Sequence, residues 1–164
     1  MKIKFSITAI TALLILTFAP FASAQDGDKA AIDKFISAQA TREQAEEYAE
    51  ARKVVTGDLN GDRVPETVVL YTIEGQQGSN NHIQYLAVFT RANGQLVPLT
   101  HTSTGSKSYR DVQLDSISSG LINLTTMSYA KNDPSCCPTL KGNAWYKLTL
   151  GRLVAVKARV KRSQ

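Results

Sequence analysis

Apolar residues follow a helical period near the N-terminus of the chain. Within residues 28–53, Ile32 and Ile36 fall on one side of a helix, which predicts an amphipathic helix in this region. Thr41 and Gln44 have the spacing of a capping box, so a second helix is predicted to begin there. The pattern therefore predicts two N-terminal helices that cover one face of a sheet.

Beyond Val54 the chain consists of short β-branched and aromatic runs that are separated by turn residues. Asn93-Gly94 lies between two apolar runs and predicts a two-residue hairpin, because both positions tolerate positive φ. Turns are also predicted at residues 118–120 and 151–152. Strands joined by such short turns must run antiparallel. The predicted class is α+β, with N-terminal helices packed on a curled antiparallel sheet of about six or seven strands.

Residues 1–24 have the three parts of an export signal. Two lysines precede an apolar run over residues 7–21, and small residues at 22–24 form a cleavage site. The apolar run is short for a membrane span, which needs about 20 residues. The sequence therefore predicts a signal peptide at 1–24 and a single exported domain at 25–164. The expected location is the periplasm or the exterior, with no membrane span after the signal is removed.

The charge of the chain is unevenly distributed. It carries 19 Lys+Arg, two of them in the signal, against 14 Asp+Glu. Four basic residues, Lys157, Arg159, Lys161 and Arg162, alternate with apolar residues at the C-terminal end. A nucleic-acid binder needs a broad basic face, so this distribution argues against nucleic acid as a partner. The alternation indicates either the solvated face of a last strand or attraction to an anionic lipid or envelope polymer.

Oxygen-bearing side chains recur at alternate positions in the loop before the strand that begins at Thr67. The candidate ligands of a metal ion are Asp58, Asn60, Asp62, the carbonyl of Val64, and Glu66. Calcium accepts six to eight oxygens in flexible geometry, so calcium in a structural role is the predicted ion. The alternative is a plain turn in which Asp and Asn side chains bond their own backbone.

This segment resembles the calcium loops of the FG-GAP and VCBS repeat families, whose pattern is close to D-x-N-G-D-G-x-P-D. Arg63 replaces the usual glycine, and Glu66 replaces an aspartate. A side chain at that glycine costs steric energy if the position needs positive φ. Those families repeat the motif, and this chain has one copy, so the resemblance implies a local loop and not a propeller.

Cys136 and Cys137 are the two cysteines of the chain and are adjacent. Two free thiols rarely persist in an oxidising compartment. Cα atoms across a trans peptide lie about 3.8 Å apart, whereas ordinary disulfides span roughly 4.4–6.8 Å, so a bond between neighbours is possible but strained. Three interpretations remain: a stiff turn flanked by Pro134 and Pro138, a redox or copper-handling thiol pair, and intermolecular pairing.

The segment from Asp133 to Thr139 resembles an Asp-x-x-Cys-Cys-Pro-Ser/Thr signature of small exported bacterial proteins, including LppP/LprE-type lipoproteins. Lys107, Tyr109 and Arg110, which follow Gly105, are similar to a Gly-x-Lys-x-Tyr-Arg segment of the same group. This chain has no lipid-attachment cysteine. The resemblance implies an exported domain of uncharacterised function.

No catalytic motif stands out in the sequence. His82 and His101 are the only histidines, and no Gly-x-Ser-x-Gly turn is present. We therefore expect a non-enzymatic envelope domain that binds a ligand or partner through polar loops, with Lys107, Tyr109 and Arg110 in the binding loop. The alternatives are a thiol redox or copper-handling protein and a periplasmic lysozyme-type inhibitor, whose Ser-Gly-x-x-Tyr loop is similar to residues 104–109.

Overall fold

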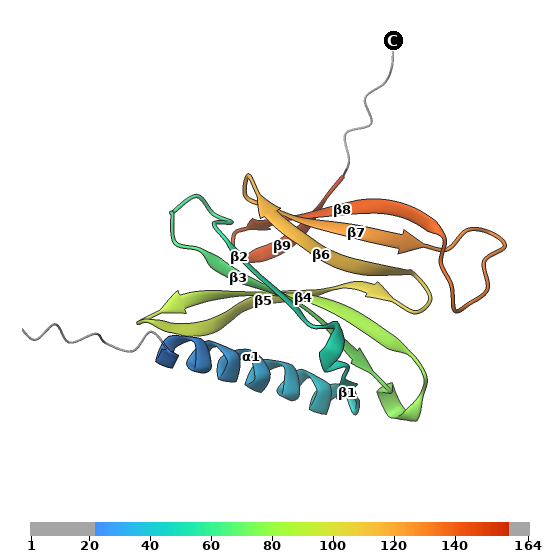
Figure 1. Ribbon diagram of the computed structural model, residues 1–164, viewed down its shortest axis with the longest axis horizontal. Helices are drawn as coiled ribbons and strands as arrows, with labels where there is room; N and C mark the ends of the chain where they lie inside the picture. Colours follow the sequence, from blue (N-terminus) through green and yellow to red (C-terminus); the bar gives the residue numbers. More distant parts are fainter. Residues whose placement is uncertain (1–21, 158–164) are drawn as a thin grey trace, which may run out of the picture.

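The computed structural model describes residues 22–157, in which one helix precedes a nine-stranded antiparallel sheet (Figure 1). The strand order is β1-β3-β4-β5-β6-β7-β8-β9, and β2 pairs with the same edge of β3 as β1. In chain order the elements are α1 (Ala22–Glu43), β1 (Glu46–Glu47), η1 (Ala49–Ala51), β2 (Lys53–Gly57), β3 (Glu66–Glu74), η2 (Gln76–Gly78), β4 (His82–Ala92), β5 (Gln95–Ser106), β6 (Arg110–Ser118), β7 (Leu121–Ser128), β8 (Leu140–Thr149) and β9 (Arg152–Val156).

The antiparallel sheet with a helix agrees with the predicted class, but the prediction of a second helix was wrong. Gln44 has φ 51° and ends α1. The N–H of Gln44 donates to the Thr41 carbonyl (3.2 Å) and the N–H of Ala45 to the Ala40 carbonyl (3.0 Å), as in a Schellman motif. The Thr41 hydroxyl donates back to the Ser37 carbonyl (2.8 Å) and caps no new helix. Pairing of Glu46 with Glu74 then makes this segment a sheet edge.

The expected number of strands was too low. Two of the nine strands, β1 and β2, pair one after the other along the same edge of β3, and η1 lies between them in the chain. This edge lies within residues 44–57, most of which the helical pattern assigned to a helix. The local sequence of this segment favours a helix, but β3 provides hydrogen-bond partners for its backbone. Pairing with β3 therefore overrides the local preference.

The strands form two half-sheets that meet at a fold line between β5 and β6. Within the described residues, Ser106 and Arg110 are the single paired position between these strands. The second half-sheet (β6–β9) folds back over the first (β1–β5), and the sheet does not close into a barrel. At Gly57 on β2 there is no space for a side chain, because a Cβ would lie 2.8 Å from the Cγ2 of Ile117 on β6.

Strands β3 and β4 are buried on both faces (Figure 1). On one face, Ile32, Ile36 and Ala40 of α1 pack with apolar side chains of the first half-sheet (Val69, Tyr71, Ile73, Ala87, Phe89, Leu96). On the other face, the second half-sheet completes a separate core (Leu59, Val68, Leu70, Leu86, Val88, Val112, Leu114, Ile122, Leu124, Tyr146). A strand covered on both faces must be apolar at nearly all successive positions, which explains the run from Val68 to Ile73, in which every residue is buried and Thr72 is the one polar member.

Two sequence predictions fall outside the described residues. They are the apolar run of the export signal at 7–21 and the end of the expected last strand beyond residue 157. Strand β9 itself ends at Val156. Within residues 22–157, no helix has the length and apolar character needed to cross a membrane.

Candidate functional site

A cavity of about 640 Å³ lies between the two half-sheets beside the fold line. Its lining comes from β4, β5, β6, β8, β9 and the turn before β6, and it includes Tyr85, Thr104, Tyr109, Arg110 and Tyr146. Arg110 is the one charged residue among the described residues that line it. The cavity therefore combines a fixed positive charge with aromatic surface.

Hydrogen bonds hold the Arg110 guanidinium in this cavity. Its Nε donates to the Thr104 carbonyl (2.9 Å), and its Nη2 donates to the Tyr146 hydroxyl (3.4 Å). Its Cζ lies 4.7 Å from the centroid of the Tyr109 ring, within the range of a cation–π contact. Within residues 22–157 no carboxylate lies at salt-bridge distance from Arg110. The arginine is thus positioned by neutral groups and keeps its charge uncompensated.

The Tyr146 hydroxyl is a second polar group in the cavity. It accepts a hydrogen bond from the Thr104 hydroxyl (3.1 Å) as well as the bond from Arg110. Thr104 and Tyr146 are 2% and 6% exposed, so both hydroxyls are held in a fixed place. A phenol can accept two hydrogen bonds and still donate one, so Tyr146 keeps its proton for a further acceptor.

The fold line itself is built by Gln84 and Gly105. Beyond Ser106, β5 offers β6 no backbone partner, and the Gln84 side chain takes that role. Its Nε2 donates to the Val112 carbonyl (3.1 Å), and its Oε1 accepts from the Val112 N–H (2.8 Å). A Cβ on Gly105 would lie 2.5 Å from the Gln84 Oε1 and 2.7 Å from the Arg110 carbonyl oxygen, so only glycine fits.

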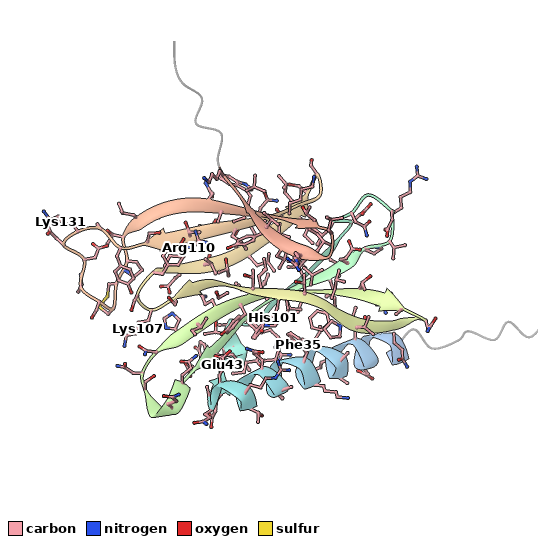
Figure 2. All side chains as sticks on the ribbon, turned by 180° about the vertical axis from the view of Figure 1, so that it is seen from behind. Phe35, Glu43, His101, Lys107, Arg110 and Lys131 are labelled. Atoms are coloured by element: carbon pink, nitrogen blue, oxygen red, sulfur yellow. A yellow bond between two sulfur atoms is a disulfide. The ribbon has the colours of Figure 1, made fainter. Side chains whose placement is uncertain are left out.

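The structure brings two of the three predicted binding-loop residues into the cavity. Tyr109, 58% exposed, and Arg110 line it. Lys107 lines a separate cavity of about 260 Å³, and its Nζ donates to the Asn80 carbonyl (3.1 Å). Figure 2 shows Arg110 between the half-sheets and Lys107 on the side of β4 and β5. Sequence reasoning included Thr104 in the polar loop but missed Tyr146, because these distant residues meet only after the second half-sheet folds back.

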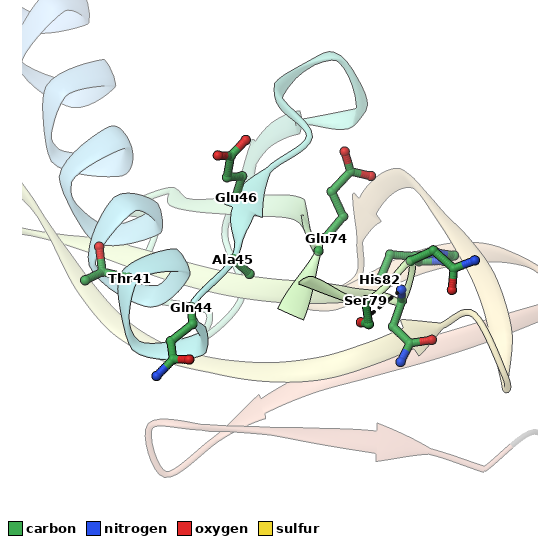
Figure 3. A pocket seen from close by; sticks show the side chains of 10 residues that line it. Thr41, Gln44, Ala45, Glu46, Glu74, Ser79 and His82 are labelled. Atoms are coloured by element: carbon green, nitrogen blue, oxygen red, sulfur yellow. Dashed lines mark hydrogen bonds between the residues drawn. The ribbon is translucent and has the colours of Figure 1, made fainter. Parts of the chain in front are cut away.

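A larger cavity of about 740 Å³ lies between the end of α1 and the loop after β3 (Figure 3). Glu46 pairs with Glu74, and Glu74 pairs with His82, so these three residues form one row across β1, β3 and β4. Figure 3 shows both carboxylates directed to the same side. The His82 Nε2 lies 3.2 Å from the Asp111 Oδ1 and is thereby engaged elsewhere. This cavity has no tyrosine, phenylalanine or tryptophan in its lining, and its charge is negative, because Glu46 and Glu74 have no basic partner at salt-bridge distance within residues 22–157.

The predicted calcium loop directs its side-chain oxygens at its own backbone. Asp58 accepts from the N–H groups of Gly61 (2.7 Å), Arg63 (3.0 Å) and Asn60 (3.2 Å). The bond from Gly61, followed by those from Arg63 and Asn60, holds the pKa of Asp58 below its ordinary value. Arg63 has φ 69°, so the side chain that replaces the glycine of the repeat families does stand in the left-handed region.

The buried carboxylate of Glu66 connects the end of this loop to its beginning. It is 1% exposed, and it accepts bonds from the Leu59 N–H (2.8 Å) and from the Asn60 Nδ2 (3.0 Å). The same Nδ2 donates to the Asp62 Oδ2 (2.9 Å), so an amide lies between two carboxylates. In the part of the chain that the structure describes, no three His, Cys, Asp or Glu side chains gather as metal ligands. The plain-turn interpretation describes the observed bonds, and calcium binding stays a prediction.

Cys136 and Cys137 form a disulfide with their Cα atoms 3.8 Å apart. Both are exposed in the loop between β7 and β8, which extends to one side in Figure 2, where Lys131 marks it. Asp133 holds this loop closed. It accepts from the N–H groups of Ala130 (2.7 Å) and Thr139 (2.9 Å), and the first of these bonds is the main cause of its lowered pKa.

Comparisons with known proteins add no relative. No protein-family model, curated protein or solved structure matches the chain. The resemblances drawn from residues 58–66 and 133–139 therefore stay predictions, and the site has to be argued from its own geometry.

If the Asp58 loop binds calcium, the ion will raise the melting temperature of the protein. Binding to the folded state at about 100 times the dissociation constant adds roughly 2.7 kcal/mol, and loops of extracellular modules bind at about 10⁻⁴–10⁻³ M. We expect Asp62→Asn to abolish the rise, because it removes a charge and keeps an oxygen for the Val64 N–H. Asp115→Asn, on β6, is the matched control and should keep it. An unchanged melting curve at millimolar calcium would leave only the turn.

Replacing both cysteines by serine should change stability little, because the disulfide closes a ring with almost no chain in it. Asp133→Ala should lower the melting temperature more, since it removes the bonds that close the loop. Thermal melts of the two variants test this order. A loss of about 2–5 kcal/mol in the double serine variant, as for ordinary native disulfides, would contradict it.

Proposed function

We propose that the protein is an exported, non-enzymatic binding domain that holds a small anion with an apolar portion in the Arg110 cavity. The observation that carries this proposal is the uncompensated guanidinium of Arg110 in a cavity whose other lining residues are uncharged. A volume of about 640 Å³ falls within the usual range of ligand pockets, roughly 300–1,000 Å³.

The hydrogen-bond donors left free in the cavity suit a carboxylate or a phosphate. A guanidinium has five N–H donors, and the bonds to Thr104 and Tyr146 use one on Nε and one on Nη2. Both Nη atoms keep donors for a ligand, and a planar guanidinium binds an anion through two parallel bonds. The free proton of Tyr146 supplies a further bond to the same anion.

The apolar portion of the ligand would lie against the uncharged side of the cavity. Ile83 and Tyr85 belong to this lining, and the Tyr109 ring stands at the guanidinium with more than half of its surface exposed. An aromatic ring beside a cation favours ligands that present a flat or apolar group next to an acid. Monocarboxylates with an aromatic or branched aliphatic group form the class that fits best.

A second candidate function is thiol–disulfide exchange. The observation in its favour is that Cys136 and Cys137 are exposed and joined to each other. A partner dithiol would be oxidised to its disulfide as the bond between the two cysteines is reduced to two thiols. Intact mass after incubation with a dithiol and alkylation measures this exchange, and a bond that resists reduction would exclude the function.

Titration with phenylacetate, followed by calorimetry, tests the binding function. We expect phenylacetate to bind and the neutral phenylacetamide to bind at least tenfold more weakly, because hydrogen bonds to a charged group contribute about 1.5–3 kcal/mol. Arg110→Gln should weaken phenylacetate binding by a similar factor. Arg91→Gln is the matched control, since Arg91 pairs with Asp28 away from the cavity.

The proposal fails if carboxylates and their amides bind equally, or if Arg110→Gln leaves the affinity unchanged. A melting curve of each variant separates loss of the site from loss of the fold. Tyr109→Ala provides a second test and should also weaken phenylacetate binding, because it removes the ring next to the guanidinium. Tyr109 is already largely exposed, so its removal should leave the fold intact.

A further inference from the structure

Strands β8 and β9 present a second surface on the side away from the core. Tyr146 is buried in the core, and Leu148 and Leu153 pack against it. Successive side chains of a strand alternate between faces, so Trp145 and Lys147 of β8 lie on the opposite side of the strand from Tyr146. Trp145 is partly buried, and with Val156 it also lines the Arg110 cavity, which the face therefore adjoins. Trp145 pairs with Val156 and Lys147 with Val154. Paired residues share a face, and the valines are 40% and 49% exposed.

Basic side chains surround these apolar residues on the same face. Lys141 and Lys147 lie on β8 at alternate positions with Trp145, and Arg152 of β9 pairs with Thr149. All three basic residues are exposed. The β8–β9 face is defined here by six residues, Lys141, Trp145, Lys147, Arg152, Val154 and Val156.

The charge of the molecule is segregated toward this face. Residues 116–157 hold five basic residues and a single acid, Asp133, whose carboxylate is bound within its own loop. Residues 25–115 hold nine basic and 13 acidic residues. The nearest outward acids of the same half-sheet, Asp111 and Asp115, lie on β6, two strands or about 10 Å from β8. The positive region is therefore confined to β8, β9 and the loop before β8.

We propose that the β8–β9 face docks on an anionic phospholipid surface. The lysines and the arginine would contact lipid phosphates, at about 1 kcal/mol for each charge near such a surface. Trp145, Val154 and Val156 would enter the interfacial layer, where tryptophan is favoured. A water-soluble polyanion would leave the two valines exposed, so the apolar part of the face favours a lipid layer. The sequence continues from β9 with Lys157, Arg159, Lys161 and Arg162.

Flotation with lipid vesicles tests this docking. The protein is recovered from expressing cells, its mass identifies its N-terminal residue, and it is mixed with vesicles of phosphatidylglycerol and phosphatidylcholine or of phosphatidylcholine alone. We expect binding to the anionic vesicles and little to the neutral ones. Changing Lys141, Lys147 and Arg152 to Gln together should weaken binding roughly a hundredfold. The matched control changes Lys29, Lys34 and Arg63 to Gln, which removes the same charge elsewhere and should have little effect.

Trp145 provides a direct readout, because it is the only tryptophan of the chain. Its emission should shift to shorter wavelength on anionic vesicles and be quenched by brominated lipids, whereas polyphosphate should produce neither change. Equal losses in the two triple variants, an unshifted emission, or equal binding to both kinds of vesicle would overturn the proposal. Lys141, Lys147 and Arg152 do not line the Arg110 cavity, so the triple variant should keep phenylacetate binding, which separates failure of this face from failure of the cavity.

Discussion

The burial of β3 and β4 on both faces is the constraint on which the rest of the structure depends. Val68, Val69, Tyr71, Leu86 and Phe89 are fully buried, and they alternate between the core under α1 and the core under the second half-sheet. Neither α1 nor the second half-sheet alone excludes water from both faces of these strands. The helix and the second half-sheet must therefore both pack, and burial of apolar area supplies the main driving force for each.

This double burial requires the sheet to fold back on itself, and the fold line follows from that requirement. Between β5 and β6 the backbone ladder shrinks to the pair of Ser106 and Arg110, and the Gln84 side chain satisfies Val112 in place of a strand. The two half-sheets leave a cavity beside this line, into which Arg110 projects. The same folding turns the inner side of β8 toward the core and leaves Lys141 and Lys147 of its outer side exposed.

Much of the sheet could be predicted because the residues of tight hairpin turns can be recognised in the local sequence. Asn93-Gly94 has both φ angles positive, as do Ser119-Gly120 and Leu150-Gly151, so three hairpins use the same kind of tight turn. The last of these lies one residue earlier than predicted. The helix boundary was missed because Gln44 adopts the left-handed conformation without being glycine. The candidate site was half predicted. Tyr109 and Arg110 belong to one polar loop, whereas Tyr146 joins them only through the fold line.

The packing of β2 against β6 tests the folded-back arrangement most directly. These strands are not neighbours in the sheet, and Gly57 can contact Ile117 only if the second half-sheet lies over the first. A nuclear Overhauser spectrum of the protein in solution should show a cross-peak between the Gly57 Hα protons and the Ile117 methyl groups. Its absence, in a spectrum that retains the cross-peaks between β2 and β3, would contradict the double burial of β3 and β4.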